Sequence, residues 1–132
     1  MFLLISHKKW NILKRKMVSP NMKRVFVETT IFTKRWKELK LTDNDLQNLQ
    51  NFILKNPNAG DVIPGTGGLT KLRWGLPSKG KSGGLRVLHI DFTRQEKVFL
   101  VNCYTKSRKD TLSDSEKAMY RELIHSIKEA LQ

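Results

Sequence analysis

Three segments with the residue pattern of β-strands follow one another in the second half of the chain, and they limit the folds open to it. Residues 69–74 and 85–92 alternate between two faces, whereas residues 97–104, KVFLVNCY, are mostly apolar. Alternation is typical of a strand with two different faces, and a nearly continuous apolar run is typical of a strand buried on both. The sequence therefore predicts a β-meander whose third strand is central.

Helical periodicity appears on both sides of this meander. One helix is expected over residues 31–39 after a cap at Thr29 or Thr30, and a second helix is expected after Thr42. A last helix is expected over residues 114–131, where Ser and Glu have the spacing of a capping box. The apolar positions of the three helices are Phe32, Trp36 and Leu39, then Leu46, Leu49, Phe52 and Ile53, then Met119, Leu123, Ile127 and Leu131.

One further β-type segment, residues 22–28 (MKRVFVE), comes before the helices. The predicted order is β-α-α-β-β-β-α, in which the lone first strand must return to the sheet after the two helices. The predicted fold class is α+β. We expect a small, mainly antiparallel sheet packed against an N-terminal helical hairpin, with a C-terminal helix.

The beginning of the chain differs in composition from the rest. Residues 1–21 contain several cations and no acidic residue, and Ser19-Pro20-Asn21 forms a break after them. We therefore expect a flexible basic N-terminal extension over residues 1–21 and one compact domain over residues 22–132. The alternative for the first segment is a short amphipathic helix whose apolar face holds Leu4, Trp10 and Leu13.

The charge balance indicates a polyanionic partner. Lys and Arg total 25 against 12 Asp and Glu, which gives a net charge of +13 at pH 7. Such an excess favours binding to nucleic acid, to a ribosome or to an acidic protein. The single cysteine, Cys103, excludes an intramolecular disulfide and suits a reducing cytosol. No Cys/His cluster has the spacing of a metal site, so we expect no metal or other cofactor.

The cations are most concentrated in residues 65–89, GTGGLTKLRWGLPSKGKSGGLRVLH. No Asp or Glu occurs between residues 61 and 91, and the glycines allow a ligand to approach the backbone closely. A cationic hairpin of this kind suits a phosphodiester, although a solvated lysine-rich loop on an edge hairpin explains the pattern equally well. The cations are Lys71, Arg73, Lys79, Lys81 and Arg86.

The segments GDVIPGTGGLTKLRW, KGKSGGLRVLHIDF and VFLVNCYTKSRKDTLS, in this order, resemble the RelE/ParE superfamily of bacterial toxins, and within it the HigB-type toxin of a toxin–antitoxin pair. The resemblance covers about residues 22–132. It implies a small metal-free ribonuclease in the cytoplasm that cuts mRNA on the ribosome. It also implies a cognate antitoxin that silences the toxin and through which alone the toxin meets operator DNA, and no membrane partner.

The same resemblance suggests site residues. Lys71 and Arg73 match the paired cations of the strand after the glycine-rich segment, and Arg86 matches a family arginine after the next Gly step. Tyr104 and Lys106 lie where the family has its last catalytic group. These five are the catalytic candidates. The candidates for RNA binding are Trp74, for which core packing is the more favoured role, His89, which stands where many relatives have Tyr, and Lys79, Lys81 and Arg108.

RNA can be cut without a metal when its 2′-OH attacks the adjacent phosphate, which requires a base, charge stabilisation at phosphorus and an acid. Arginine suits the charge stabilisation because guanidinium is always charged and binds two phosphate oxygens. Strict alternation places Arg86 and His89 on opposite faces of their strand, and we favour Arg86. The competing interpretations are a non-catalytic toxin of this fold that inhibits gyrase and a basic RNA-binding module.

Overall fold

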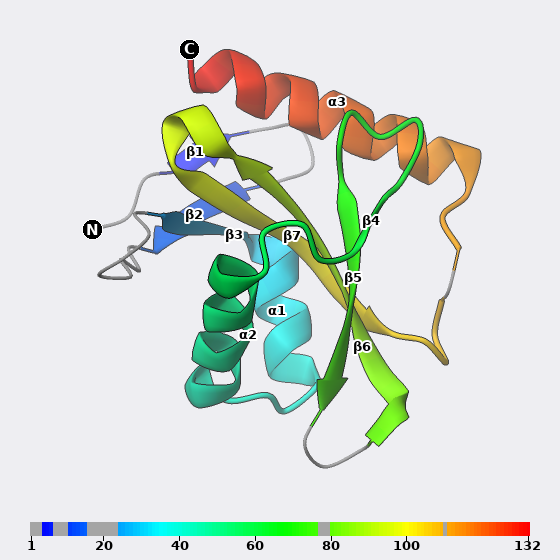
Figure 1. Cartoon of the computed structure of the whole chain (residues 1–132). Coiled ribbons are helices and arrows are strands. Elements are labelled where there is room, and N and C mark those ends of the chain that lie inside the picture. Colours follow the sequence, from blue (N-terminus) through cyan, green and yellow to red (C-terminus); the bar gives the residue numbers. More distant parts are fainter. Residues whose placement is uncertain (1–3, 7–10, 16–23, 77–79, 110) are drawn as a thin grey trace.

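The computed structural model describes residues 4–6, 11–15, 24–76, 80–109 and 111–132, and within these it gives residues 4–6, 11–15, 76 and 80–83 by their backbone alone. In chain order the elements are β1 (Leu4–Ser6), β2 (Asn11–Arg15), β3 (Val25–Thr29), α1 (Thr30–Glu38), α2 (Asp43–Lys55), β4 (Asp61–Val62), β5 (Thr70–Leu76), β6 (Gly80–Phe92), the short 3-10 helix η1 (Thr93–Gln95), β7 (Lys97–Thr105) and α3 (Asp114–Ala130) (Figure 1).

The strands form one mixed sheet with the order β1-β2-β3-β7-β6-β5-β4. The strands β5, β6 and β7 are joined in an antiparallel meander, and β3 lies parallel to β7 on its other side. The predicted α+β class is confirmed, and so is the central position of the apolar strand β7. The chain leaves β3 through two helices rather than through a hairpin turn, and a long connection of this kind is what parallel pairing of β3 with β7 requires.

Two strands lie in the segment that was expected to be a basic extension. Leu4–Ser6 pairs with Asn11–Arg15, and this second strand pairs with β3, antiparallel in both cases. The other residues of 1–21 lie outside the described part of the chain. The division of the chain at residue 21 therefore stays a prediction.

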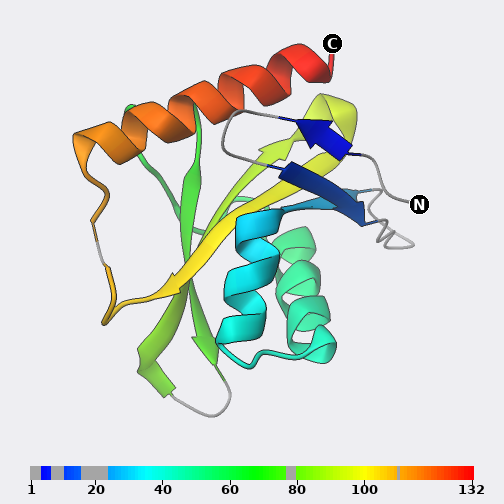
Figure 2. The same cartoon turned by 180° about the vertical axis from the view of Figure 1, so that it is seen from behind.

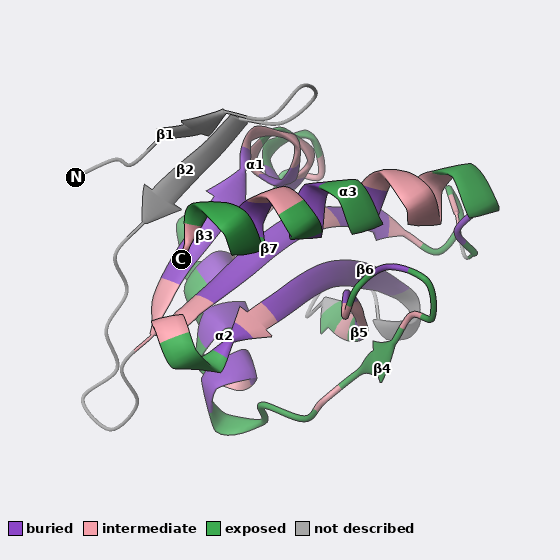
Figure 3. Ribbon diagram, turned by 90° about the horizontal axis from the view of Figure 1, so that it is seen from above, coloured by how far each residue is buried: buried purple, intermediate pink, exposed green. Residues whose placement is uncertain are grey.

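Helices cover both faces of the sheet (Figures 1 and 3). On one face, which we call the hairpin face, α1 and α2 pack on a cluster that includes Leu72, Val87 and Leu100. On the other, the α3 face, the last helix packs on a cluster that includes Leu88 and Phe99. Both clusters use alternate residues of the same strands, so the period-two pattern of the sequence decides which side chains enter which core.

The helix starts follow the predicted capping chemistry. The Thr29 side chain accepts a hydrogen bond of 3.0 Å from the Phe32 amide, and both capping boxes, Thr42 with Asp45 and Ser113 with Glu116, are present. Within the described ranges, each helix falls short of the length and apolarity required to span a bilayer.

Candidate functional site

Three residues predicted to act on RNA form one row across the meander. Arg73 of β5 lies directly opposite Arg86 of β6, and Arg86 lies directly opposite Tyr104 of β7. Directly opposed residues of antiparallel strands point to the same face, with Cβ atoms about 4.5–5.5 Å apart. Tyr104 belongs to the core cluster under α3, so the whole row points to the α3 face. We call these residues the arginine–tyrosine row.

The exposure of the row changes from one strand to the next. Arg73 is exposed, whereas Arg86 is 4% exposed and Tyr104 is 6% exposed. Arg73 and Arg86 line a pocket of about 380 Å³ together with Trp74, Gly75 and Gly84. A guanidinium stays charged even when it is buried, so Arg86 and its exposed neighbour Arg73 give this pocket a strong preference for anions.

Lys71 lies two residues before Arg73 on β5 and on the same face, and an acidic residue of β4 pairs with it across the strands. It is directly opposite Leu88 of β6 on one side and Asp61 of β4 on the other. Gly60 allows β4 to approach, because a Cβ added there would lie 2.8 Å from the Lys71 carbonyl oxygen and the backbone φ is +94°. The pairing of β4 with β5 therefore places an acidic residue directly across from one of the strand cations.

The remaining basic candidates lie around the ends of the strands. Lys106 and Arg108 are exposed in the turn after β7, where the Arg108 amide donates a 3.1 Å hydrogen bond to the Thr105 carbonyl. Lys79 lies outside the described residues, and Lys81 is described by its backbone alone. The arrangement of these two lysines relative to the pocket stays a prediction.

Trp74 points to the hairpin face, and its ring packs against Phe52 of α2 with the centroids 5.0 Å apart. The side chain is half-buried, and the residue also contributes to the wall of the pocket between Arg73 and Arg86. Its ring contact is the core role favoured from the sequence. Stacking on an RNA base stays a proposal for this residue.

His89 is not brought to the row. It is directly opposite Thr70 and Leu100, which places it on the hairpin face, and a register shift separates it from Leu88. It is 4% exposed, and burial lowers the pKa of its imidazole to about 4 although the charge of Asp91 raises it. The histidine is therefore neutral in the folded protein at neutral pH.

The buried His89 gives the stability of the fold a defined pH dependence. In the unfolded chain its pKa is about 6.5, so on acidification the unfolded state takes up a proton first. The free energy of unfolding is expected to fall as the pH drops from about 6.5 to about 4, by about 3 kcal/mol for this group at about 1.4 kcal/mol per pKa unit.

The measurement is urea unfolding of the wild type and of His89→Gln between pH 4 and pH 7. The variant is expected to lose the part of the pH slope that belongs to this group. Equal slopes in the two proteins would show that the imidazole is already protonated, or hydrated, in the native state.

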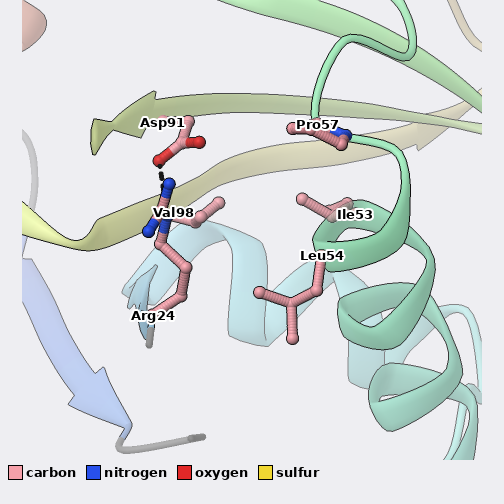
Figure 4. Close-up of a pocket in the computed structure, with 6 residues that line it drawn as sticks. All are labelled: Arg24, Ile53, Leu54, Pro57, Asp91 and Val98. Atoms are coloured by element: carbon pink, nitrogen blue, oxygen red, sulfur yellow. Dashed lines mark hydrogen bonds and ion pairs between the residues drawn. The ribbon is translucent and has the colours of Figure 1, made fainter. Parts of the chain in front are cut away.

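A small pocket away from the row contains a link between the residue before β3 and β6, which lie on either side of β7. Arg24 Nε donates to Asp91 Oδ1 at 3.1 Å beside a space of about 60 Å³ (Figure 4). Apolar side chains form the rest of its wall. The ion pair links the start of β3 to the end of β6. Because the one arginine in this wall is paired with a carboxylate, the small pocket does not favour anions as the pocket at Arg73 and Arg86 does. The apolar wall is made by Ile53, Leu54, Pro57 and Val98.

Sequence reasoning missed one cation. The sequence did not single out Arg35 of α1, but it lines a pocket at the end of β7 together with Arg108. The two arginines are far apart in the sequence, and only the packing of α1 on β7 brings them to the same pocket. No group of three or more His, Cys, Asp or Glu side chains comes together among the residues that the structure describes.

A comparison with protein families matches residues 23–132 to a model described as the RelE toxin of the RelE / RelB toxin–antitoxin system. The matched region runs from just before β3 to the end of the chain. It contains the arginine–tyrosine row, the cationic turn after β7 and α3, and it leaves out β1 and β2.

Proposed function

The chain belongs to the RelE toxin family of toxin–antitoxin systems, and from this premise we propose that it is a HigB-type, metal-independent endoribonuclease that cuts mRNA on the ribosome. The observation that carries the proposal is the arginine–tyrosine row. Two directly opposed arginines on one face of a sheet, beside a pocket, form an arrangement suited to the charge that develops on a phosphate.

In the proposed reaction the 2′-oxygen of the message bonds to the neighbouring phosphorus, and the bond from phosphorus to the 5′-oxygen breaks. The products are a 2′,3′-cyclic phosphate and a free 5′-hydroxyl. Arg73 and Arg86 bind the non-bridging oxygens, whose charge increases in the transition state. In this assignment the exposed guanidinium of Arg73 can reach the incoming RNA, and the buried guanidinium of Arg86 provides a positive charge that is held in place before the RNA binds.

The two proton transfers need other groups. Lys71, on the same face as the row, is the candidate that accepts the proton of the 2′-OH. The hydroxyl oxygen of Tyr104 is buried, whereas Lys106 is exposed just beyond the end of β7, so we assign proton donation to Lys106 and the positioning of Arg86 to Tyr104.

The proposal also names partners. The ribosome and mRNA are the substrate assembly, and they match the strongly basic composition of the chain, with a net charge of +13. A cognate antitoxin binds the toxin, and contact with operator DNA occurs only through that antitoxin. The site of action is the cytoplasm, where translating ribosomes are present.

Induction of the chain in growing bacteria tests the function. Growth is expected to stop, and mapping of RNA ends is expected to find mRNA fragments with 5′-hydroxyl ends inside codons of translated messages. Blocking translation initiation before induction is the control, because it removes the ribosome-bound substrate. DNA damage with intact mRNA would instead identify a gyrase inhibitor of the same fold, and growth arrest with neither would indicate a non-catalytic RNA-binding module.

A further inference from the structure

A second pocket lies next to the arginine–tyrosine row, at the end of β7. It has a volume of about 240 Å³, and its wall includes Arg35 and Glu38 of α1, Tyr104 of β7 and Arg108 of the following turn. Figure 2 shows that the end of β7 and the last turn of α1 lie toward the same end of the molecule, where the hairpin of β5 and β6 also projects. Pockets that enclose a drug-sized ligand usually have volumes of about 300 Å³ or more. This pocket is smaller, so it suits one group of a larger ligand.

The charges of this pocket favour a phosphate. Among the described residues neither Arg35 nor Arg108 takes part in an ion pair, and the two approach the pocket from different elements. Glu38 opposes them, but its carboxylate is about half exposed and lies 4.0 Å from Lys34 Nζ. Two guanidinium groups against one solvated carboxylate leave a net positive site with the planar donors that bind phosphate oxygens.

The second pocket lies under α1, where Leu39 and Cys103 of the hairpin-face cluster also line it, and it meets the arginine–tyrosine row at a single residue. Tyr104 contributes to the wall of the second pocket, and it is directly opposite Arg86, which lines the first. A strand of RNA carries a phosphate on every nucleotide, so a strand held at Arg73 and Arg86 presents a neighbouring phosphate nearby. An acidic partner protein would also meet positive charge here, but its binding would not depend on the position of this pocket beside Arg86.

We propose that the pocket between Arg35 and Arg108 is a second phosphate subsite, which holds the single-stranded message next to the phosphate that is cut. The inference rests on the proposed function and adds to it a substrate-holding contact from α1. It also gives Glu38 a definite effect, because a carboxylate in the wall of a phosphate site weakens binding of the strand.

The test measures binding of a short single-stranded RNA with 2′-O-methyl groups, which cannot be cut, to the intact protein at several salt concentrations. The variant Arg35→Gln with Arg108→Gln is expected to bind about tenfold to a hundredfold more weakly. Its salt slope is expected to fall by about 0.7, the contribution of one phosphate of a single strand. Glu38→Gln is expected to bind several-fold more tightly at low salt, an opposite sign that unfolding cannot imitate.

Arg94→Gln with Lys128→Gln is the matched control, because it removes the same charge from exposed positions in η1, before β7, and in the last turn of α3. It is expected to change binding only slightly. If the Arg35 and Arg108 variant binds the RNA no more weakly than this control, the subsite is disproved. Loss of binding only to the ribosome, or only to an antitoxin, would likewise overturn the proposal and assign the pocket to that partner.

Cleavage assays on ribosomes carrying a defined message separate this inference from the proposed function. If Arg73→Ala abolishes cutting while Arg35→Gln with Arg108→Gln leaves KM and kcat unchanged, the nuclease function stands and the subsite fails. If the wild type neither binds nor cuts RNA, both proposals fail. The expected result is cutting by the wild type and a KM raised about tenfold or more in the double variant, with a smaller change in kcat.

Discussion

Replacing Arg73 by alanine is expected to lower the rate of mRNA cleavage about a hundredfold to a thousandfold, the usual loss when one preorganised donor to a transition-state charge is removed. The side chain is exposed on β5, so its removal leaves both cores intact. The free energy of unfolding is therefore expected to stay within about 0.5 kcal/mol of the wild type. Single-turnover cleavage on programmed ribosomes and urea unfolding measure the two quantities separately.

Arg86 requires a gentler substitution because it is 4% exposed, and alanine would leave a cavity under the sheet. Arg86→Lys keeps the positive charge and loses the two-pronged donor geometry, so cleavage is expected to fall by a similar factor if Arg86 binds the phosphate directly. Arg94→Ala, which removes an exposed arginine in η1 before β7, is the control for the loss of charge in Arg73→Ala. Cleavage that persists in a protein with both Arg73→Ala and Arg86→Lys would disprove the proposed site.

Much of the fold follows from local patterns that the sequence shows directly. The capping boxes at Thr42 and Ser113 mark where two helices begin, and the apolar run of β7 identifies the central strand before any pairing is known. The short strand β4 and the pairing of β1 and β2 with β3 were not predicted. A two-residue strand has no periodicity to detect, and the segment of β1 and β2 is dominated by its charges.

The candidate site could be predicted only in part, because alternation gives the face of a residue but not its partner on the next strand. Arg73 and Arg86 each have a face that the sequence indicates, but their direct opposition depends on the register of β5 and β6. The approach of Asp61 to Lys71 and of Arg35 to Arg108 depends on tertiary packing between distant segments. The separation of His89 from the row agrees with the alternation in the sequence, which places His89 and Arg86 on opposite faces of their strand.

The second large effect is expected in the core under α3. Phe99 is 0% exposed in the central strand, and its ring meets Phe92 edge to face, with the centroids 5.4 Å apart. Phe99→Ala removes most of a buried aromatic ring from a cluster that also holds α3, so the free energy of unfolding is expected to fall by about 3–5 kcal/mol. Urea unfolding measures the loss. The free energy of unfolding of Phe99→Leu is expected to lie between those of Phe99→Ala and the wild type.

The two substitutions are expected to give opposite patterns, and this contrast separates the fold from the chemistry. Val62→Ala is the stability control for Phe99→Ala, because Val62 is 64% exposed and its truncation is expected to change stability by less than about 0.5 kcal/mol. In conditions where Phe99→Ala remains folded, it is expected to cut mRNA at close to the wild-type rate, whereas Arg73→Ala is stable and inactive. A Phe99→Ala protein that loses less than about 1 kcal/mol would show that β7 is not the closely packed centre of the sheet. A folded Phe99→Ala protein that has lost its activity would show that the position of Arg86 depends on the α3 core.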